Sequence, residues 1–216
     1  MLQQFHDIKH VLYINLDSRI DRRTHFEMEF NKIGLHTQRF PAIANEDGAV
    51  GCSMSHIACL ELAIKNNWDH VLICEDDATI INPGQLVYQV NQFLKKNGDN
   101  WDVMLLTGNN YHPFRQFSPE CVRVGNCQTA TSYLVRQPYF ETLLSNFKNG
   151  LNSLINTRDQ PNYAIDQYWK HLQRIHRWYL IVPISIIQRA DYSNICKQHV
   201  DYGKEMLNIN KKWYGK

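Results

Sequence analysis

The sequence lacks long hydrophobic runs and a charge excess of either sign. No stretch comes near the roughly 18 consecutive apolar residues of a membrane-spanning helix. Lys and Arg number 23 and Asp and Glu number 21, and the net charge of +2 does not indicate a dedicated nucleic-acid binder. Residues 1–10 hold no apolar core of signal-peptide length, and no Asn-x-Ser/Thr acceptor site occurs. These absences predict a cytoplasmic protein.

Several binding motifs are missing as well. No Gly-x-Gly-x-x-Gly follows the first predicted strand, and there is no P-loop and no Gly-x-Ser-x-Gly elbow. A dinucleotide dehydrogenase or a P-loop enzyme is therefore not indicated. None of the six cysteines forms a Cys-x-x-Cys pair, so we expect mostly buried thiols in a reducing compartment. A zinc site is not predicted, because no His/Cys cluster has ligand spacing.

What remains is an ordinary globular composition. The 216 residues are 44% hydrophobic and 20% charged, which is typical of one soluble domain. Apolar runs alternate with helical periodicity in the first half and predict successive βα units. We expect an α/β fold with a mostly parallel central sheet flanked by helices. The expected strands are 10–16, 38–43 at an edge, 71–74 and 101–107, and the expected helices are 19–34, 54–67 with Ser53 as N-cap, and one opened by Asn82 and Pro83.

The second half has a weaker pattern. Residues 108–128 indicate a long loop or an extended hairpin, and loops of that length are often functional. We expect Trp101, Trp169 and Trp178 in the core rather than as platforms for sugar rings. The remaining elements are predicted as a strand at 131–136, helices at 139–147 and 164–172, a strand at 178–187 interrupted by Pro183, and a polar end from residue 190.

Three adjacent carboxylates, Glu75-Asp76-Asp77, directly follow the apolar run of residues 71–74. Their charges repel one another, and local folding does not require them. They end a predicted buried strand, which is where open α/β sheets bind ligands. Mg²⁺ or Mn²⁺ would relieve the repulsion and could bridge a diphosphate. The alternative is one helix-capping carboxylate beside two solvated ones, and the triplet alone favours neither.

Polar residues near the first strand are weaker candidates. Asn15 ends that strand, where its side chain or backbone could hydrogen-bond to the edge of a ligand or its side chain could form a turn. Arg19, Arg22 and Arg23 begin the next helix and could meet phosphate. A solvated basic face is the alternative for each arginine.

Further candidates lie later in the chain. Ser55 and His56 are predicted in the first turn of a helix, a natural anion site, although a lone His is usually a satisfied polar residue. Asp166 precedes an amphipathic run and could be a general base or a helix cap. The residues after the last apolar strand are placed on the same rim: Gln188, Tyr192 and Ser193.

In combination, these segments resemble glycosyltransferase family 25. That family includes bacterial lipooligosaccharide galactosyltransferases and collagen hydroxylysine galactosyltransferases of animals and large DNA viruses. The order and spacing of these segments match the family over about residues 8–140. Beyond residue 140 the resemblance is limited to residues 164–166 and 188–195. The matching segments are Tyr13–Arg23, Gly48–His56, Val71–Ala78, Trp101–Leu106 and Thr129–Leu134.

The resemblance implies a GT-A-type nucleotide-sugar transferase fold in a single domain over residues 1–216. Residues 1–107 would form the nucleotide-sugar-binding half and residues 108–216 the acceptor-side half. The implied reaction is an inverting, metal-dependent transfer of a hexose, galactose first, from a UDP-sugar. The implied acceptor is a hydroxyl on a glycan, a lipooligosaccharide or a collagen-like hydroxylysine. Mn²⁺ is the implied ion, with Mg²⁺ as the alternative.

The resemblance also implies roles for particular residues. Asp77 would hold the metal with support from Glu75, and Asp76 would reach the ribose of the donor. Asp166 would deprotonate the acceptor hydroxyl. The other implied donor-side residues are Asn15 and Leu16 near the uracil, Arg19 and Arg22 near the donor, and Gly51, Ser55 and His56 along the same cleft.

The chain departs from the long collagen enzymes, since it carries one transferase unit and no lumenal signal. That weakens the expectation of a collagen acceptor. A place at the membrane periphery or in a virus-infected host cell stays open beside the cytoplasm. The basic, aromatic tail of residues 210–216 could meet an anionic bilayer, although a solvated tail is the simpler expectation.

Two other functions use the same residues. A non-catalytic descendant of the fold would bind a nucleotide without turnover, but the intact acidic triplet argues against it. A metal-dependent phosphatase or nuclease would need a second acidic cluster for two ions, and the sequence shows no convincing one.

Overall fold

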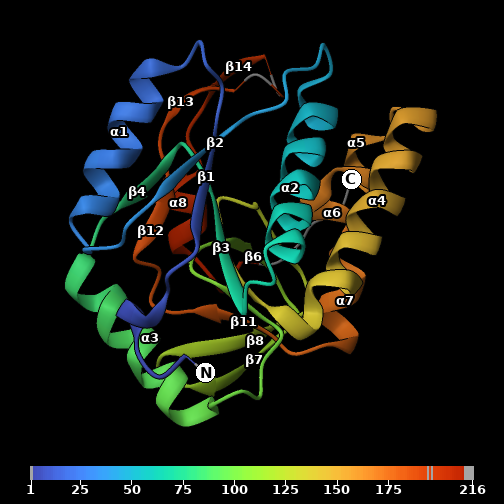
Figure 1. Ribbon diagram of the computed structural model, residues 1–216. Helices are drawn as coiled ribbons and strands as arrows, with labels where there is room; N and C mark the ends of the chain where they lie inside the picture. The colour runs from blue at the N-terminus through green and yellow to red at the C-terminus, as the bar shows by residue number, and fades with distance from the viewer. Residues whose placement is uncertain (1, 194, 196, 212–216) are drawn as a thin grey trace.

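The computed structural model describes residues 2–193, 195 and 197–211. Its centre is an eight-stranded sheet with helices on both faces (Figure 1). In spatial order the strands are β2 (Gln38–Pro41), β1 (Val11–Asn15), β3 (His70–Glu75), β10 (Ser132–Arg136), β5 (Val103–Leu105), β11 (Trp178–Ile181), β8 (Cys121–Val124) and β7 (Phe114–Ser118).

Most strands of this sheet run in one direction. β1 pairs in parallel with β2 and with β3, and β11 pairs in parallel with β5. β10 is antiparallel to both of its neighbours, β3 and β5. β8 is likewise antiparallel to β11 and β7. The predicted mostly parallel sheet is therefore confirmed, with β10 and β8 as the reversed strands.

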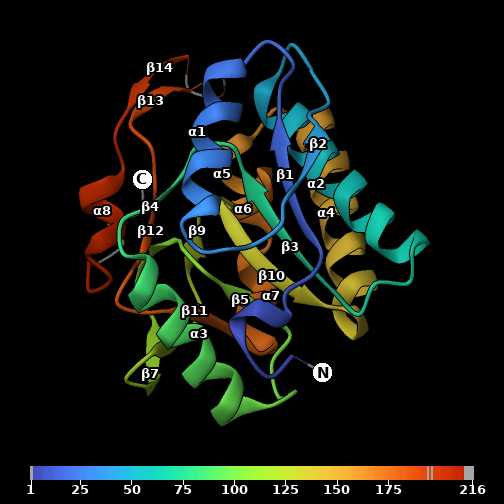
Figure 2. The same cartoon turned by 60° about the vertical axis from the view of Figure 1, so that its left-hand side comes forward.

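The four longest helices lie two on each face of the sheet. Figure 1 shows α1 and α3 on one side and α2 and α4 on the other, and Figure 2 shows the same layers from the side. Phe26 and Phe93 belong to the apolar cluster on the α1 side, whereas Leu60 and Phe147 belong to the cluster on the α2 side. The helices are α1 (Ile20–Asn31), α2 (Gly48–Lys65), α3 (Pro83–Asn97) and α4 (Phe140–Thr157).

Shorter elements surround this core. Three two-stranded sheets pair β4 with β12, β13 with β14, and β6 with β9. Their bounds are β4 (Ala78–Ile80), β12 (Ile186–Gln188), β13 (Asp191–Ser193), β14 (Gln198–Val200), β6 (Asn109–Asn110) and β9 (Cys127–Gln128). The short helices are η1 (Phe5–Asp7), η2 (Gln137–Tyr139), α5 (Gln160–Tyr163), α6 (Ile165–Tyr168), α7 (Lys170–Ile175) and α8 (Gly203–Leu207).

Local chemistry explains several predicted boundaries. The Asn82 side chain accepts a hydrogen bond from the Gln85 amide at the start of α3, and Pro83 takes the first helical position. β2, which contains Pro41, is an edge strand as expected. Pro183 separates β11 from β12, and residues 114–124 form the β7–β8 hairpin inside the expected loop or hairpin. The three tryptophans expected in the core, Trp101, Trp169 and Trp178, are all buried.

The start of α2 differs from the prediction. The helix begins at Gly48 rather than near Met54, because the Asp47 side chain accepts hydrogen bonds from the amides of Ala49 and Val50. The predicted N-cap, Ser53, therefore lies inside the helix. The expectation that Ser55 and His56 form a helix N-terminal anion site is wrong, since both lie about two turns into α2.

The second half also corrects two helix predictions. α4 extends to Thr157, beyond the expected end at residue 147, and residues 164–172 divide between α6 and α7. Gly150 explains part of this arrangement, because a Cβ atom there would lie 2.8 Å from the Tyr168 ring. The absence of a side chain lets α4 pack closely against α6.

The described residues allow a direct comparison with the predictions of buried thiols and of no membrane-spanning helix. Five cysteines are free thiols, of which Cys52 is half-buried and the other four are buried. Cys196 and residues 212–216 of the basic tail lie outside the described residues. Among the helices that are described, none combines the length and apolarity needed to cross a membrane.

The packing of α2 against the sheet can be tested at Leu60, which is fully buried. We expect Leu60→Ala to lower the free energy of unfolding by about 2–5 kcal/mol in urea titrations, because it leaves a cavity in the core. Glu61→Ala is the matched control, since Glu61 forms only a surface ion pair with Lys148 and should change stability by less than about 1 kcal/mol. Equal effects of the two substitutions would contradict the packing described for α2.

Candidate active site

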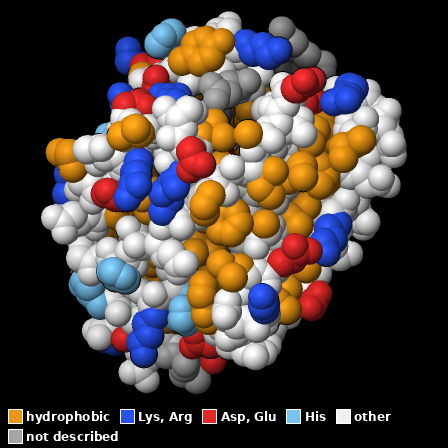
Figure 3. Space-filling view, turned by 45° about the horizontal axis from the view of Figure 1, so that its top comes forward, with side chains coloured by type: hydrophobic (Ala, Val, Ile, Leu, Met, Phe, Trp, Pro, Cys, Tyr) orange, Lys and Arg blue, Asp and Glu red, His pale blue; other side chains and the backbone are white. Residues whose placement is uncertain are grey.

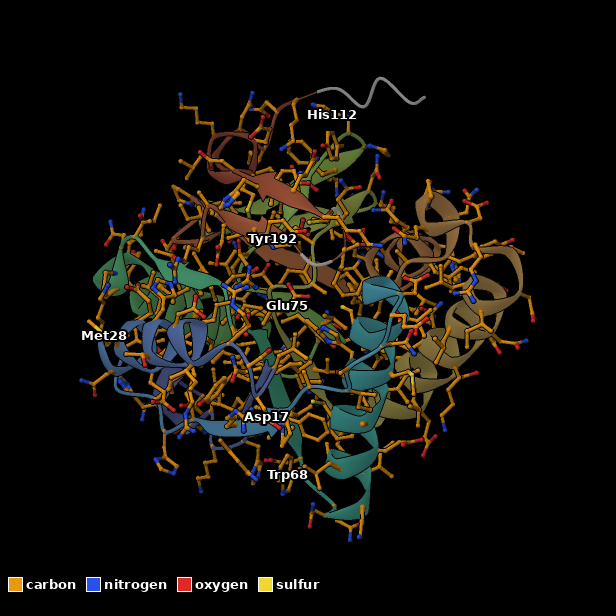
Figure 4. All side chains as sticks on the ribbon, turned by 90° about the horizontal axis from the view of Figure 1, so that it is seen from above. Asp17, Met28, Trp68, Glu75, His112 and Tyr192 are labelled. Carbon is orange, nitrogen blue, oxygen red and sulfur yellow. The ribbon has the colours of Figure 1, made fainter. Side chains whose placement is uncertain are left out.

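A cavity of about 460 Å³ opens where the carboxyl ends of β1 and β3 meet α2 and the C-terminal strands. Figure 4, seen from above the sheet, places Glu75 near the middle, between α1, α2 and the strands beside Tyr192. Figure 3 shows this side tilted forward, with a band of hydrophobic side chains from the centre to the upper right and charged side chains on both sides of it. The predicted site residues that line the cavity are Leu16, Arg19, Arg22, Gly51, Ser55, His56, Glu75, Asp76, Asp77 and Asp166.

Strand pairing brings the acidic triplet to this cavity. β3 is buried as far as Cys74, and its last residue, the half-buried Glu75, is paired in register with Ile14 of β1. The chain then turns at Asp76 and Asp77 before β4 begins. Asn15, the last residue of β1, consequently lies beside the turn. It does not line the cavity but supports a residue that does.

Asp76 is held by two donors. Its carboxylate accepts hydrogen bonds from Asn15 Nδ2 at 2.7 Å and from Arg22 Nη1 at 3.0 Å. Asn15 Nδ2 also donates to the Arg19 carbonyl oxygen at 3.0 Å. Asn15 therefore does more than form a turn, because its side chain links Asp76 to the start of α1. Burial raises the pKa of Asp76, and the charge of Arg22 together with the Asn15 hydrogen bond opposes that shift only in part.

Asp77 has one satisfied and one unsatisfied oxygen. Oδ2 accepts hydrogen bonds from Gln188 Nε2 at 2.9 Å and from Arg22 Nη1 at 3.4 Å. Oδ1 is buried and has no hydrogen-bond partner among the described residues. Burial, followed by the charge of Glu75, raises the pKa of Asp77 to about 7. A divalent cation would satisfy Oδ1 and stabilise the charged carboxylate, so this residue fits a hard metal ion.

Glu75 is turned toward α2 rather than toward Arg22. Its Oε2 accepts a hydrogen bond from Thr131 Oγ1 at 3.2 Å. Its Oε1 lies 3.5 Å from His56 Nε2 and accepts a hydrogen bond from Cys52 Sγ at 3.6 Å. The carboxylates of Glu75 and Asp77 therefore contact different parts of the structure.

Two arginines join the acidic turn to the C-terminal strands. Arg22 Nε and Arg19 Nη2 lie 3.0 Å and 2.7 Å from the same carboxylate oxygen of Asp191. Arg22 also donates to the Tyr192 carbonyl at 3.0 Å. Although burial opposes it, the Tyr192 amide and both arginines lower the pKa of Asp191. Arg23 instead pairs with Glu27 at the surface. Of the two interpretations of this residue, a solvated basic side chain rather than a phosphate ligand fits the structure.

Gly51 and Ser55 shape the α2 wall of the cavity. A Cβ atom at Gly51 would lie 2.7 Å from the Ile43 carbonyl oxygen, so a larger residue would displace the backbone of the loop after β2. Ser55 Oγ accepts from the Ile43 amide at 2.9 Å and donates to the Gly51 carbonyl at 2.7 Å. These contacts fix the loop of residues 42–45, which lines the cavity.

Asp166 faces the cavity from α6. Its Oδ2 accepts from the Thr129 amide at 2.8 Å, and its Oδ1 accepts from Gln167 Nε2 at 3.3 Å. It does not cap a helix, because the N-cap of α6 is Ala164 and the carboxylate bonds a distant loop instead. Burial raises the pKa of Asp166 despite the Thr129 hydrogen bond and the nearby charge of Lys170.

Sequence reasoning missed several residues at this site. Cys52 was interpreted only as a buried thiol, yet it contacts Glu75. Asp191 was not considered, although it binds both cavity arginines. Its partners lie about 170 residues away in the chain, so no local pattern could indicate the contact. Of the three rim residues predicted near it, Gln188 and Ser193 line the cavity, whereas Tyr192 contributes its carbonyl.

The raised pKa of Asp77 predicts a pH-dependent stability. Because the folded-state pKa of about 7 exceeds the ordinary 3.8, the charged carboxylate destabilises the fold progressively between those values and fully above them. With a chelator present, we expect Asp77→Asn to raise the free energy of unfolding at pH 8 by on the order of 2 kcal/mol. The gain should disappear as the pH falls toward 4. Urea titrations across this range measure it.

Glu141→Gln, an exposed substitution on α4, is the control and should change stability by less than about 0.5 kcal/mol at every pH. A difference between Asp77→Asn and the unmodified chain that stays constant from pH 4 to 8 would show that Asp77 does not titrate as described.

Comparison with known proteins adds curated relatives. The chain is 25% identical over 130 residues to a Haemophilus influenzae protein provisionally named a glycosyltransferase, covering 50% of this chain and 45% of that one. It is 26% identical over 98 residues to an Anopheles gambiae glycosyltransferase 25 family member, covering 32% and 17%. The chain thus spans less than half the length of either relative.

Solved structures show a shared fold at low identity. A197 from STIV superposes with a TM-score of 0.51 at 12% identity, covering 89% of this chain and 93% of that one. The glycosyltransferase GlyE of Streptococcus pneumoniae superposes with a TM-score of 0.50 at 8% identity, covering 81% and 45%. The expected GT-A-type fold is confirmed.

The family comparison covers a longer stretch than either relative. The family model described as glycosyltransferase family 25 (LPS biosynthesis protein) matches residues 46–212, which span α2, the acidic turn and Asp166. Because that match covers well over half of the chain, this protein belongs to glycosyltransferase family 25.

Proposed function

We propose that this protein transfers a hexose, galactose in the first place, from a UDP-sugar to a hydroxyl acceptor by an inverting, metal-dependent reaction. The observation that carries the proposal is Asp77, whose buried Oδ1 has no partner among the described residues and belongs to a carboxylate lining the cavity. Mn²⁺, or Mg²⁺ in its place, would be held by Asp77 and would neutralise the diphosphate of the donor. The predicted support from Glu75 stays a prediction.

The first half of the chain supplies the donor side in this proposal. Arg19 and Arg22 are positioned near the acidic turn, where their guanidinium groups can bind phosphate oxygens. Asp76, oriented by Asn15, is proposed to accept a hydrogen bond from the ribose. Leu16 and the loop of residues 42–45 offer an apolar wall for the uracil.

The second half supplies the acceptor side. Asp166 is proposed as the base that removes the proton from the acceptor hydroxyl while that oxygen attacks the anomeric carbon and the bond to UDP breaks. The Thr129 amide holds Oδ2 of this carboxylate in place. Gln128 and Gln167 line the same cavity, and their amides suit sugar hydroxyls. The division into a donor half, residues 1–107, and an acceptor half, residues 108–216, stays a prediction, and Gln188 and Asp191 of the second half contact donor-side residues.

The acceptor is proposed by chemical class. It is a hydroxyl on a glycan, on a lipid-linked sugar such as a lipooligosaccharide, or on a protein side chain such as hydroxylysine. A competing nuclease or phosphatase would need a second acidic cluster. Among the described residues, the one group of three or more metal-binding side chains is Cys52, His56 and Glu75, which is not a second carboxylate cluster.

Release of UDP from a panel of UDP-sugars tests the donor side. We expect slow, Mn²⁺-dependent hydrolysis without acceptor, fastest with the true donor. Asp77→Ala should lower that rate at least about 100-fold, the size typical of losing a group that stabilises developing charge. Glu141→Gln should keep the rate.

Full activity in Asp77→Ala would refute the proposed role of Asp77. Tight UDP binding by calorimetry with no turnover of any sugar donor would instead support a non-catalytic, nucleotide-binding protein.

The pH dependence of transfer tests Asp166. A base works when deprotonated, and burial raises the pKa of Asp166, so we expect the rate to rise with pH through a value above the ordinary range for Asp. Asp166→Asn should lower kcat about 100- to 10,000-fold and remove this dependence. Asp159→Asn, which keeps a helix-capping side chain outside the cavity, is the control. An unchanged pH profile in Asp166→Asn would assign the base elsewhere.

A further inference from the structure

Three potential metal ligands meet on the α2 side of the cavity. Cys52 and His56 lie one turn apart on α2, and Glu75 ends the neighbouring strand β3. Their ligand atoms all lie within 4.8 Å of one another. The sequence did not predict this group, because Glu75 is distant from the other two along the chain and a single Cys/His pair is too few ligands to indicate a site.

The two distances from Glu75 to the other ligand atoms suit tetrahedral coordination. Glu75 Oε1 lies 3.6 Å from Cys52 Sγ and 3.5 Å from His56 Nε2. Zinc bonds of about 2.3 Å to sulfur and about 2.0–2.1 Å to nitrogen or oxygen, at tetrahedral angles, separate ligand atoms by roughly 3.3–3.6 Å. An ion could therefore bind these three atoms with little rearrangement of Glu75, drawing together Cys52 Sγ and His56 Nε2, which lie within 4.8 Å of each other.

His56 provides an independent observation. The side chain is completely buried, and its Nε2 atom, 3.5 Å from Glu75 Oε1, makes no hydrogen bond among the described residues. A buried ring nitrogen without a partner is destabilising, and a metal ion is one group that can satisfy it. The opposite ring nitrogen, Nδ1, lies 2.8 Å from the Tyr133 hydroxyl, which orients the ring. Such a contact on the far nitrogen is typical of a metal-binding His.

We propose that Cys52, His56 and Glu75 bind a zinc ion at the wall of the cavity. All three residues line the cavity, so the fourth coordination position faces it and would take water or a ligand oxygen. Thr131 Oγ1 donates to the second oxygen of Glu75 and orients that carboxylate. On binding, the Cys52 thiol releases its proton to solvent, because the thiolate is the ligand.

This site differs in chemistry from the one proposed at Asp77. A thiolate and an imidazole favour zinc over Mg²⁺ and Mn²⁺, whereas Asp77 offers only carboxylate oxygen. The zinc site uses Glu75 Oε1, while Oε2 bonds Thr131, so a Glu75 that binds zinc no longer supports the hard ion, and Asp77 alone remains as that ion's ligand. Zinc binding needs no sugar donor and can be tested whether or not transfer occurs.

The zinc content of purified protein is the first test. Protein without an affinity tag, produced in zinc-supplemented medium and dialysed extensively, should carry about one zinc per chain by inductively coupled plasma mass spectrometry. Cys52→Ser and His56→Gln should each reduce the content to background. Cys59→Ala, a substitution of another buried cysteine on the same helix, should keep it. Thermal melts by circular dichroism check that each variant is folded.

Cobalt substitution tests the same ligands in the unmodified chain, so it holds even if a variant fails to fold. Co²⁺ added to metal-free protein should produce a sulfur-to-cobalt charge-transfer band, which zinc then abolishes. Mn²⁺ should not displace the bound Co²⁺, so the band should remain when Mn²⁺ is added. Asp77→Asn should keep the cobalt band, because that residue is not a ligand of this ion. Absence of the band in the unmodified protein, or equal zinc content in the protein, Cys52→Ser and His56→Gln, would overturn the proposal without bearing on sugar transfer.

Discussion

Three carboxylates lie together where β3 ends, Asp76 and Asp77 buried and Glu75 half-buried, and their mutual repulsion must be balanced by the groups around them. Each carboxylate is stabilised by different contacts. Glu75 turns to α2, Asp76 is held by Asn15 and Arg22, and Asp77 keeps one buried oxygen without a partner among the described residues. The cavity forms around these contacts, because the same arginines reach Asp191 and draw the C-terminal strands over the acidic turn. Removing Arg22 from this network would leave the carboxylates of Asp76 and Asp77 without their compensating positive charge, which is strongly destabilising.

The fold around this network positions two walls of different character. α2 approaches the loop after β2 closely enough that only glycine fits at position 51, and Ser55 bonds the same loop. The opposite wall comes from the second half of the chain, where Asp166 bonds the Thr129 amide. The first wall brings together a cysteine, a histidine and a carboxylate, whereas the second is rich in amides. One cavity therefore presents separate surfaces suited to metal ions, to a charged donor and to neutral hydroxyls.

Much of this arrangement could be predicted from sequence, and the reasons are local. The apolar run of residues 71–74 and the acidic turn after it identified both β3 and the edge of the sheet where the site lies. Asn82 and Pro83 fixed the start of α3 for the same kind of reason. What escaped prediction depends on contacts between distant segments. The N-cap of α2 is Asp47, six residues before the predicted Ser53. His56 is therefore buried in the interior of the helix and does not lie at its end. Neither Asp191 nor the contact of Cys52 with Glu75 has a signal along the chain.

Calorimetric titration of UDP in the presence and absence of Mn²⁺ tests the central claim most directly. The account predicts that UDP binds strongly only with the ion present and that Asp77→Asn weakens this binding toward the ion-free level, while Asp17→Asn, an exposed carboxylate outside the cavity, leaves it unchanged. Equal UDP affinity with and without Mn²⁺, or full ion-dependent binding in Asp77→Asn, would contradict it.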